Sequence, residues 1–375
     1  MKYIEGFRNP GAAAALREDI RALTEALPPS LLRQGYGGQA NRTTNIMEVC
    51  GSHTMAIARY GIRDILPSQI KLISGPGCPV CVTDAGYIDT AIELARRGVT
   101  IVTFGDMLNV PGSDTSLAAV RSEGHSIEIC YSPLRALELA REFPEREIVF
   151  LAIGFETTVA PALAVIDQAI AAGVENLSLL VAFKLVPPAL AALMTDPDLQ
   201  IDAFLCPAHV SAIIGADAYQ PFTGSEGVPC VIAGFEPLDI LLGLKGILTQ
   251  LGSGIAEVDN QYSRVVTDAG NRRAQALMET YLEPADVSWR GIGVIPASGL
   301  ALKAEWSRYD AEQRHNVRVE VGKMDPACRC GDVIKGIASP FDCPMFGNVC
   351  TPSSPFGPCM VSSEGSCAAY YKYSR

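Results

Sequence analysis

The chain has 375 residues, of which 48% are hydrophobic and 19% charged, and this composition favours two or three globular domains over disorder. A formal net charge of −11, without any dense run of Lys or Arg, argues against nucleic acids and anionic membranes as partners. No stretch has the length of a membrane span or the apolar core of a signal peptide, so we expect a cytoplasmic protein.

An amphipathic helix is predicted near the N-terminus. Asn9 and Pro10 suit an N-cap and a first helical residue, and apolar residues then recur at helical spacing until Pro28. The stretch 33–44 that follows is rich in Gly, Gln and Asn, and we expect a surface loop or insertion without chemistry of its own.

From Ile46 onward, short apolar runs alternate with helical patterns. Continuous apolar strands separated by helices are typical of parallel sheets covered on both faces, so we predict an α/β fold. Two of the helices are expected to begin at Asp84 and at Ser132. The seven predicted strands are 70–74, 100–104, 126–131, 148–155, 177–183, 201–207 and 228–235.

The number of lobes is indicated by an internal repeat. Gly-Phe-Glu follows a strand at 154–156 and again at 234–236, which favours two Rossmann-like lobes over one large sheet. The pattern changes after Gly299, so a third, cysteine-rich domain is expected there. The predicted boundaries are 46–150 for lobe I with Cys50 and Cys78/Cys81, 151–295 for lobe II, and 1–45 with 296–375 for the cysteine-rich domain.

The C-terminal segment from Cys328 onward, here called the tail, is rich in Cys, Pro, Gly and Ser, so something other than a hydrophobic core must hold it together. In a reducing compartment a metal or redox site is favoured over structural disulfides. Zinc sites use tight Cys-x2–4-Cys pairs, whereas iron–sulfur clusters accept four widely spaced thiolates. We therefore favour a cluster, with zinc and disulfides as alternatives, and four ligands would leave two cysteines for a redox pair. The six are Cys328, Cys330, Cys343, Cys350, Cys359 and Cys367.

Two further motifs combine cysteine with positions next to helix starts. Cys78 and Cys81 form a Cys-x-x-Cys between a strand and a helix, which suits a low-pKa thiolate and dithiol–disulfide cycling. Cys50 and His53 are three residues apart and can offer a thiolate and an imidazole to one metal, or act as a nucleophile–base pair. The alternative for this motif is a buried cysteine beside an exposed histidine.

Other polar and sulfur-containing residues are weaker candidates. Glu156 and Glu236 follow strand ends, where each either serves a site or accepts backbone N–H bonds at a helix start. No Gly-x4-Gly-Lys-[Ser/Thr] loop is present, which leaves nucleotide use open. Among the cysteines in strands, Cys206 is the least certain, because Cys206–His209 lies at a strand end. Core packing is the expectation for Cys130, Cys206 and Cys230.

Five motifs in this order resemble the HypD family of [NiFe]-hydrogenase maturation factors, over about 46–373. They are MEVCGSHT, GPGCPVC, GFETT, CPAHVSAIIG and the tail from CRCG to CAAYY. The resemblance implies a scaffold on which an iron with two cyanides and one carbon monoxide is assembled. It also implies a HypC-type small chaperone and a HypE-type cyanide donor as partners, before delivery to the hydrogenase large subunit.

The resemblance further implies roles for the motifs in the first lobe. Cys50 is expected to be the iron-binding thiolate with His53 as its close neighbour. Cys78 and Cys81 are expected to be a redox dithiol beside the iron. This dithiol would collect electrons in pairs for cyanide loading.

For the tail, the resemblance implies a [4Fe–4S] cluster and a second redox pair. The pair is Cys330 and Cys359, in an arrangement similar to that of ferredoxin:thioredoxin reductase. An iron–sulfur thiol–disulfide oxidoreductase of that kind is the alternative function. The expected cluster ligands are Cys328, Cys343, Cys350 and Cys367.

Overall fold

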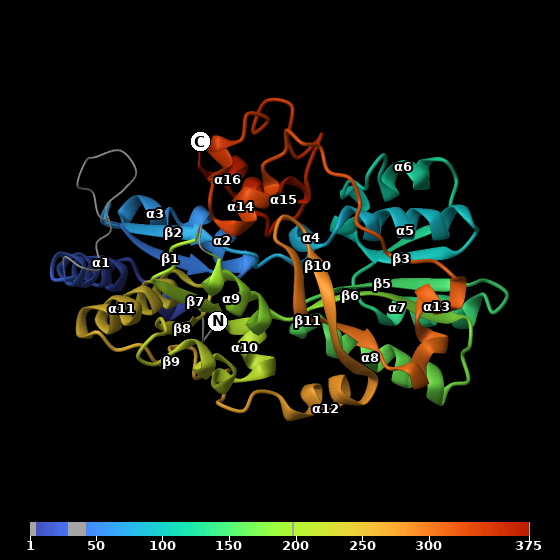
Figure 1. The fold of residues 1–375 in the computed structure, drawn as a ribbon, viewed down its shortest axis with the longest axis horizontal. Coiled ribbons are helices and arrows are strands. Elements are labelled where there is room, and N and C mark those ends of the chain that lie inside the picture. Colours follow the sequence, from blue (N-terminus) through green and yellow to red (C-terminus); the bar gives the residue numbers. More distant parts are fainter. Residues whose placement is uncertain (1–4, 29–42, 197–198, 375) are drawn as a thin grey trace.

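Two β-sheets built mainly from parallel strands form the frame of the molecule, and helices cover them (Figure 1). The computed structural model describes residues 5–28, 43–196 and 199–374. The predicted α/β fold with two parallel-rich sheets is confirmed. Over the described ranges, no helix is both long and apolar enough to cross a membrane.

The first sheet has five strands, all parallel to their neighbours. In spatial order they are β2 (Ile70–Ser74), β1 (Thr44–Glu48), β7 (Ala203–Pro207), β8 (Cys230–Ala233) and β9 (Val258–Asn260). On one face of this sheet, Ile, Leu, Val and Ala side chains form a core together with four helices. These helices are α1 (Pro10–Glu25), α2 (Gly51–Arg59), α3 (Ile62–Ile65) and α11 (Pro237–Ser253). The short elements α10 (Ala208–Ile214) and η3 (Ala216–Phe222) contact its strands β8 and β9.

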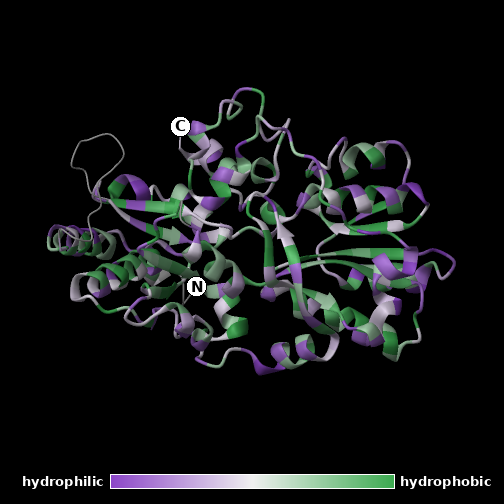
Figure 2. Ribbon diagram, in the orientation of Figure 1, coloured by the Kyte–Doolittle hydropathy of each residue, from purple (hydrophilic) through white to green (hydrophobic). Residues whose placement is uncertain are grey.

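The second sheet has six strands, and two of them form an antiparallel hairpin at one edge while the other four are parallel. In spatial order, starting with the hairpin, they are β10 (Leu282–Trp289), β11 (Gly293–Leu302), β6 (Leu177–Lys184), β5 (Ile148–Gly154), β3 (Thr100–Phe104) and β4 (Ile127–Cys130). Its helices are α5 (Ala85–Arg96), α6 (Leu117–Ser122), α7 (Leu134–Glu142), α8 (Glu156–Ala171), α9 (Val186–Thr195), α12 (Arg272–Tyr281) and α13 (Ala311–His315). Hydrophobic residues concentrate on the strands of both sheets (Figure 2).

Local sequence signals placed several elements well. The Asn9 side chain accepts hydrogen bonds from the backbone N–H groups of Gly11 and Ala12, which caps α1 as predicted. Asp84 caps α5 in the same way through the N–H of Gly86. The predicted bounds of β2 and β3 are those of the structure. The strands β1, β9, β10 and β11 were not predicted, since the last two alternate polar and apolar residues and include prolines.

The sheets divide the chain differently from the predicted boundaries. β5 pairs with β3, and β7 pairs with β1, so the chain enters the second sheet after β2 and returns to the first after β6. The pairing of β1 with β7 joins strands far apart in the sequence, which an order read along the chain does not reveal. Helix α1, which was assigned to the cysteine-rich domain, instead packs on α11 through residues such as Ile20. Of the predicted loop 33–44, all but the last two residues lie outside the described part, and Thr44 begins β1.

The tail lies at the top of the view in Figure 1, over the region where the two lobes meet. Its α14 contacts β2, its α15 contacts α4 (Pro79–Val82), and its α16 contacts α2. Its elements are α14 (Cys330–Lys335), η5 (Pro340–Asp342), α15 (Pro358–Val361) and α16 (Ser366–Tyr373). The remaining short helices are η1 (Glu5–Arg8), η2 (Gly105–Asn109) and η4 (Ala304–Tyr309).

A connecting segment, residues 316–327, reaches the tail by crossing α5. The backbone N–H of Gly322 donates to Asp84 Oδ1 at 2.7 Å, so the residue that caps α5 also holds this segment. A Cβ placed on Gly86 would lie 1.7 Å from the carbonyl oxygen of Glu320, so the crossing requires glycine there. The connecting segment is therefore fixed to the helix that follows the Cys-x-x-Cys motif.

The core between α11 and the first sheet gives a test of the fold. Leu244 is fully buried there, and replacing it by Ala leaves a cavity, so we expect Leu244→Ala to lose about 2–5 kcal/mol of unfolding free energy. The measurement is urea unfolding followed by circular dichroism. Leu134→Ala is the control, because Leu134 is 42% exposed and its loss should change stability by less than about 0.5 kcal/mol. Equal effects of the two substitutions would contradict the described packing.

Candidate functional site

All six cysteines of the tail line one small cavity, shared with Met345, Phe346 and Met360. The Sγ atoms of Cys330 and Cys359 lie 2.9 Å apart, and both thiols are buried. A Cβ on Gly357 would lie 3.0 Å from Cys328 Sγ, so Gly357 lets the backbone pass close to this sulfur. The cysteines reach the cavity from separate segments, which are Cys328 and Cys330 at α14, Cys343 after η5, Cys350, Cys359 in α15 and Cys367 in α16.

The donors in this cavity are thiols in apolar surroundings. Burial raises the pKa of the Cys367 thiol above its usual value, and the neighbouring thiols of the tail raise it further. Soft thiolate donors of this kind suit an iron–sulfur cluster, and four of the six suffice. Within residues 5–28, 43–196 and 199–374, no three His, Cys, Asp or Glu residues form a group that could hold a metal ion.

Cys78 and Cys81 are disulfide-bonded in the structure, at the start of the one-turn helix α4. Cys78 is the N-cap of α4, and its Sγ accepts a hydrogen bond from the backbone N–H of Cys81 at 3.2 Å. The predicted position between a strand and a helix is confirmed, since the motif follows β2 and precedes α5. Because α4 packs against α15, which carries Cys359, the two cysteine pairs lie on neighbouring elements.

Cys50 follows β1 and forms the N-cap of α2, where it packs against the Gly-Pro-Gly loop. The N–H of Gly51 donates to the carbonyl oxygen of Gly77 at 2.9 Å, and a Cβ on Gly77 would lie 2.3 Å from the backbone nitrogen of Cys50. Burial raises the pKa of the Cys50 thiol to about 12, and the nearby carboxylate of Glu364 raises it too. The thiol is therefore held neutral until a cation compensates the charge of the thiolate.

His53 is fully buried, so the alternative of an exposed histidine is wrong. Its Nε2 lies 3.1 Å from the carbonyl oxygen of Ala233 and 2.9 Å from that of Gly234, which assigns the proton to Nε2 and leaves a lone pair on Nδ1. Burial lowers the pKa of His53 to about 4, so the ring is neutral near pH 7. The backbone N–H groups of His53 and Ser52 and the Ser52 side chain act on the Cys50 thiol through hydrogen bonds, which partly offset the rise in its pKa.

Three residues near Cys50 were not identified from the sequence as site residues. Glu364, from the tail, accepts a hydrogen bond from the Ser52 hydroxyl at 2.7 Å. Phe235, at the end of β8, lies between two histidine rings, with centroids 4.8 Å from His53 and 4.2 Å from His209. His209 lies in the strand-end motif Cys206–His209, which was the one available signal. Glu364 comes to Cys50 from far along the chain, which sequence spacing does not reveal.

The other candidates have structural roles. Glu156 accepts a hydrogen bond from the backbone N–H of Val186 at 2.9 Å, and Glu236 caps α11 in a capping box with Asp239. Both glutamates therefore accept backbone N–H bonds at a helix start, Glu236 at α11 and Glu156 at α9, whose first residue is Val186. The predicted core position of Cys130, Cys206 and Cys230 is confirmed, because all three are buried.

Two α/β lobes with thiols gathered where they meet the tail define a thiol-based α/β protein, and comparison with known proteins gives its family. Residues 32–374 match the HypD profile, described as the Hydrogenase formation hypA family. The whole chain is 47% identical to a "Hydrogenase maturation factor HypD" of Azotobacter vinelandii, of which it covers 97%, and 42% identical to one of Escherichia coli, of which it covers 98%. It is also 46% identical to "Hydrogenase expression/formation protein HupD" of Azotobacter chroococcum, of which it covers 97%. The chain belongs to the HypD family.

Glu156 provides a test of the electrostatics of the interior. Burial raises its pKa from 4.5 to about 7, so between these values the unfolded chain releases the proton before the folded chain does. Stability contributed by the protonated carboxyl is complete below pH 4.5 and is lost as the pH rises through about 7, by on the order of 3 kcal/mol.

We expect Glu156→Gln to remove this decline, because the amide oxygen still accepts from Val186 and does not titrate. The measurement is urea unfolding of both proteins at pH 5 and pH 8. Glu138→Gln, at an exposed position of α7, should leave the decline unchanged. A decline of equal size in the wild type and in Glu156→Gln would show that another group causes it.

Proposed function

We propose that this protein is the scaffold on which the Fe(CN)2CO group of [NiFe]-hydrogenase is assembled, with the iron held as cargo by the thiolate of Cys50. The partners are a HypC-type chaperone that shares the iron, a HypE-type donor of cyanide and, after delivery, the hydrogenase large subunit. The cytoplasm is the expected compartment. Membership of the HypD family supports a role in hydrogenase maturation, and the arrangement of thiols supports this particular role.

The observation that carries the proposal is a sequence of adjoining thiol groups from the tail to Cys50. The six-cysteine cavity contains the pair Cys330/Cys359, and α15 packs against α4 with its pair Cys78/Cys81. The loop that precedes Cys78 packs, through Gly77, on the backbone of Cys50. The elements that carry these groups thus contact one another in turn, which supports a path for electrons toward Cys50.

In this proposal the tail holds a [4Fe–4S] cluster, which supplies single electrons when bound. Its ligands are Cys328, Cys343, Cys350 and Cys367. The remaining two, Cys330 and Cys359, form a dithiol that stores electrons in pairs. The 2.9 Å separation of their Sγ atoms suits the formation of a disulfide between them.

Cyanide loading explains why electron pairs are needed. If the donor presents cyanide as a thiocyanate on a cysteine, its release as cyanide requires two electrons. The thiols of Cys78 and Cys81 can supply them, because the S–CN bond breaks while a disulfide forms between the two cysteines, and the two thiol protons pass to the donor thiolate and to cyanide. The dithiol is then restored from Cys330/Cys359.

The role of the Cys-x-x-Cys pair is tested by Cys78→Ser. We expect the tail to keep its cluster absorbance while cyanide loading falls to background, because a single thiol cannot supply two electrons. The measurement combines the visible spectrum of the anaerobically purified protein with the infrared nitrile bands of its complex with the small chaperone. Cys130→Ser is the control, since Cys130 is buried in β4 away from these groups. Normal loading in Cys78→Ser would exclude the proposed relay.

The role of Cys50 is tested by Cys50→Ala. Without the thiolate the complex with the small chaperone should lose its nitrile and carbonyl infrared bands, while the tail keeps its brown colour. Bands of wild-type intensity would refute Cys50 as the iron ligand. Absence of these bands from the wild-type complex itself would favour the alternative, a thiol–disulfide oxidoreductase, which the disulfide-bonded Cys78/Cys81 pair would also suit.

A further inference from the structure

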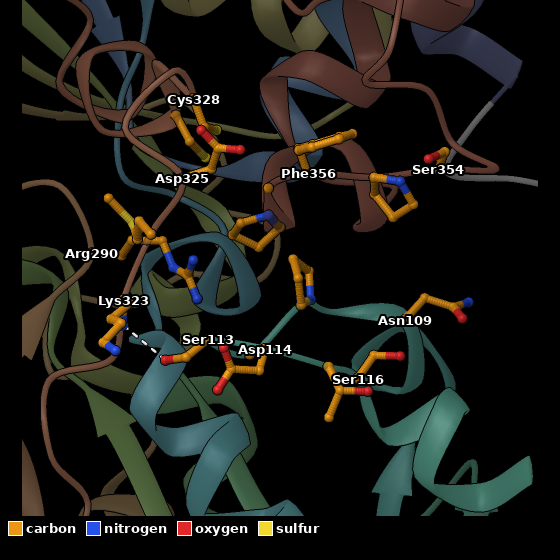
Figure 3. Close-up of a pocket in the computed structure, with 18 of the residues that line it drawn as sticks. Asn109, Ser113, Asp114, Ser116, Arg290, Lys323, Asp325, Cys328, Ser354 and Phe356 are labelled. Atoms are coloured by element: carbon orange, nitrogen blue, oxygen red, sulfur yellow. Dashed lines mark hydrogen bonds between the residues drawn. The ribbon is translucent and has the colours of Figure 1, made fainter.

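A solvent-open cleft of about 570 Å³ lies between the tail and the loop 109–116, which precedes α6 beside the second sheet (Figure 3). Its size is within the range of small-molecule sites. Cys328 and Cys330, which have roles in the proposed function, line it, but that proposal assigns no ligand to the cleft. Its walls carry charged groups, hydroxyl groups and thiols. The charged residues and cysteines among them include Asp114, Arg290, Lys323, Asp325, Cys328 and Cys330.

Arg290 is the most unusual group in the wall of the cleft, because it is a cation with only 4% exposure. Its Nε donates to the carbonyl oxygen of Thr83 at 2.8 Å, and its backbone N–H donates to that of Val82. Nη2 has no hydrogen-bond partner among the described residues. Figure 3 shows the guanidinium extending into the cleft. A buried donor without an acceptor is costly, so this guanidinium favours an anionic ligand group such as a carboxylate.

Charges of both signs line the cleft. Lys323 adds a second cation, and the exposed carboxylates of Asp114 and Asp325 add two anions. Ser353 and Ser354 of the tail add hydroxyl groups. A ligand with a single sign of charge would meet repulsion from part of this lining, whereas a molecule with both a carboxylate and an ammonium group meets partners for each.

The cleft also reaches the redox pair of the tail from one side. Cys330 lines it, whereas its partner Cys359, 2.9 Å away, is not among the described residues that do so. Cys330 is buried, with 4% exposure, but it is the member of the pair that lines the cleft, so a molecule in the cleft would approach Cys330 before Cys359. We therefore call Cys330 the outer cysteine and Cys359 the inner one. In exchange reactions the outer cysteine takes the mixed disulfide and the inner one is the leaving group.

We propose that this cleft binds a small zwitterionic peptide thiol, or its disulfide, and exchanges with the Cys330/Cys359 pair. The ligand thiolate attacks Sγ of Cys330 in the oxidised pair, so that a ligand–Cys330 disulfide forms and Cys359 leaves as a thiolate. A second ligand thiolate attacks the ligand sulfur, the ligand disulfide forms, and Cys330 leaves as a thiolate. Two ligand thiols lose two electrons, the pair gains them, and the two cysteines take up the two protons.

This exchange rests on the redox role proposed for the pair, because passing electrons to Cys78/Cys81 is what oxidises it. It gives the pair a second source of electrons that does not depend on the cluster. Binding and exchange themselves require neither the iron cargo nor a partner protein, so they can be tested separately from assembly.

The test uses the full-length, anaerobic Cys359→Ser protein, in which a mixed disulfide on Cys330 cannot be resolved. It is mixed with oxidised glutathione, which is zwitterionic, or with the uncharged disulfide of 2-mercaptoethanol. We expect peptide mass spectrometry to find glutathione on Cys330, formed at least about tenfold faster than the uncharged adduct. Equal rates for the two disulfides, or labelling of other cysteines in place of Cys330, would overturn the proposal.

Charge variants made in the same protein test the recognition. Arg290→Gln and Asp114→Asn should each bring the ratio of the two rates toward one, while Arg121→Gln, at an exposed position of α6, should leave it unchanged. Asp114 lies on an exposed loop, so its variant decides the matter if Arg290→Gln does not fold. An unchanged ratio in Asp114→Asn would overturn the proposed zwitterion site. If the proposed role of Cys50 in iron binding were wrong, the two exchange rates would not change, because exchange at Cys330 does not require iron.

Discussion

The thiol groups of this protein lie close together because the backbone of one segment packs directly on the backbone of another at glycine positions. A Cβ on Gly77 would lie 2.3 Å from the backbone nitrogen of Cys50, and a Cβ on Gly51 would lie 2.7 Å from the carbonyl oxygen of Glu364. At these points even a methyl group would force the loops apart. The Gly-Pro-Gly loop, the start of α2 and the tail therefore form one unit, and the placement of Cys50 depends on all three.

The electrostatics around Cys50 are set by burial and by one nearby carboxylate. Burial holds the Cys50 thiol and the His53 ring in their neutral forms, and the His53 ring is oriented by two backbone carbonyl oxygens. The carboxylate of Glu364 disfavours a bare thiolate nearby. A bound cation would reverse this balance, since it stabilises the thiolate that burial disfavours. In the proposed function, the Cys50 thiol therefore gives up its proton when the iron binds.

Local sequence signals predicted much of the framework. Asn9 and Asp84 marked helix starts because their side chains cap the backbone, and continuous apolar runs marked β2 and β3 because both faces of the sheets are buried. The order of the strands in the sheets was not predicted. The pairing of β5 with β3 and of β7 with β1 depends on tertiary packing, which the spacing of residues in the sequence does not reveal. The contact between Ser52 and Glu364 was missed for the same reason, because it joins residues more than three hundred positions apart.

The interleaving of the two sheets also sets an order for folding during synthesis. β1 and β2 leave the ribosome early, but the second neighbour of β1 is β7, which follows all four parallel strands of the second sheet in the chain. The first sheet is therefore completed late, after long loops have closed, and such nonlocal pairing is intrinsically slow. Until β7 is made, one side of β1 has no strand partner, although β1 is an interior strand of the finished sheet. The tail is synthesised after both sheets and then packs on their preformed surfaces. The cavity lined by its six cysteines therefore forms late in folding.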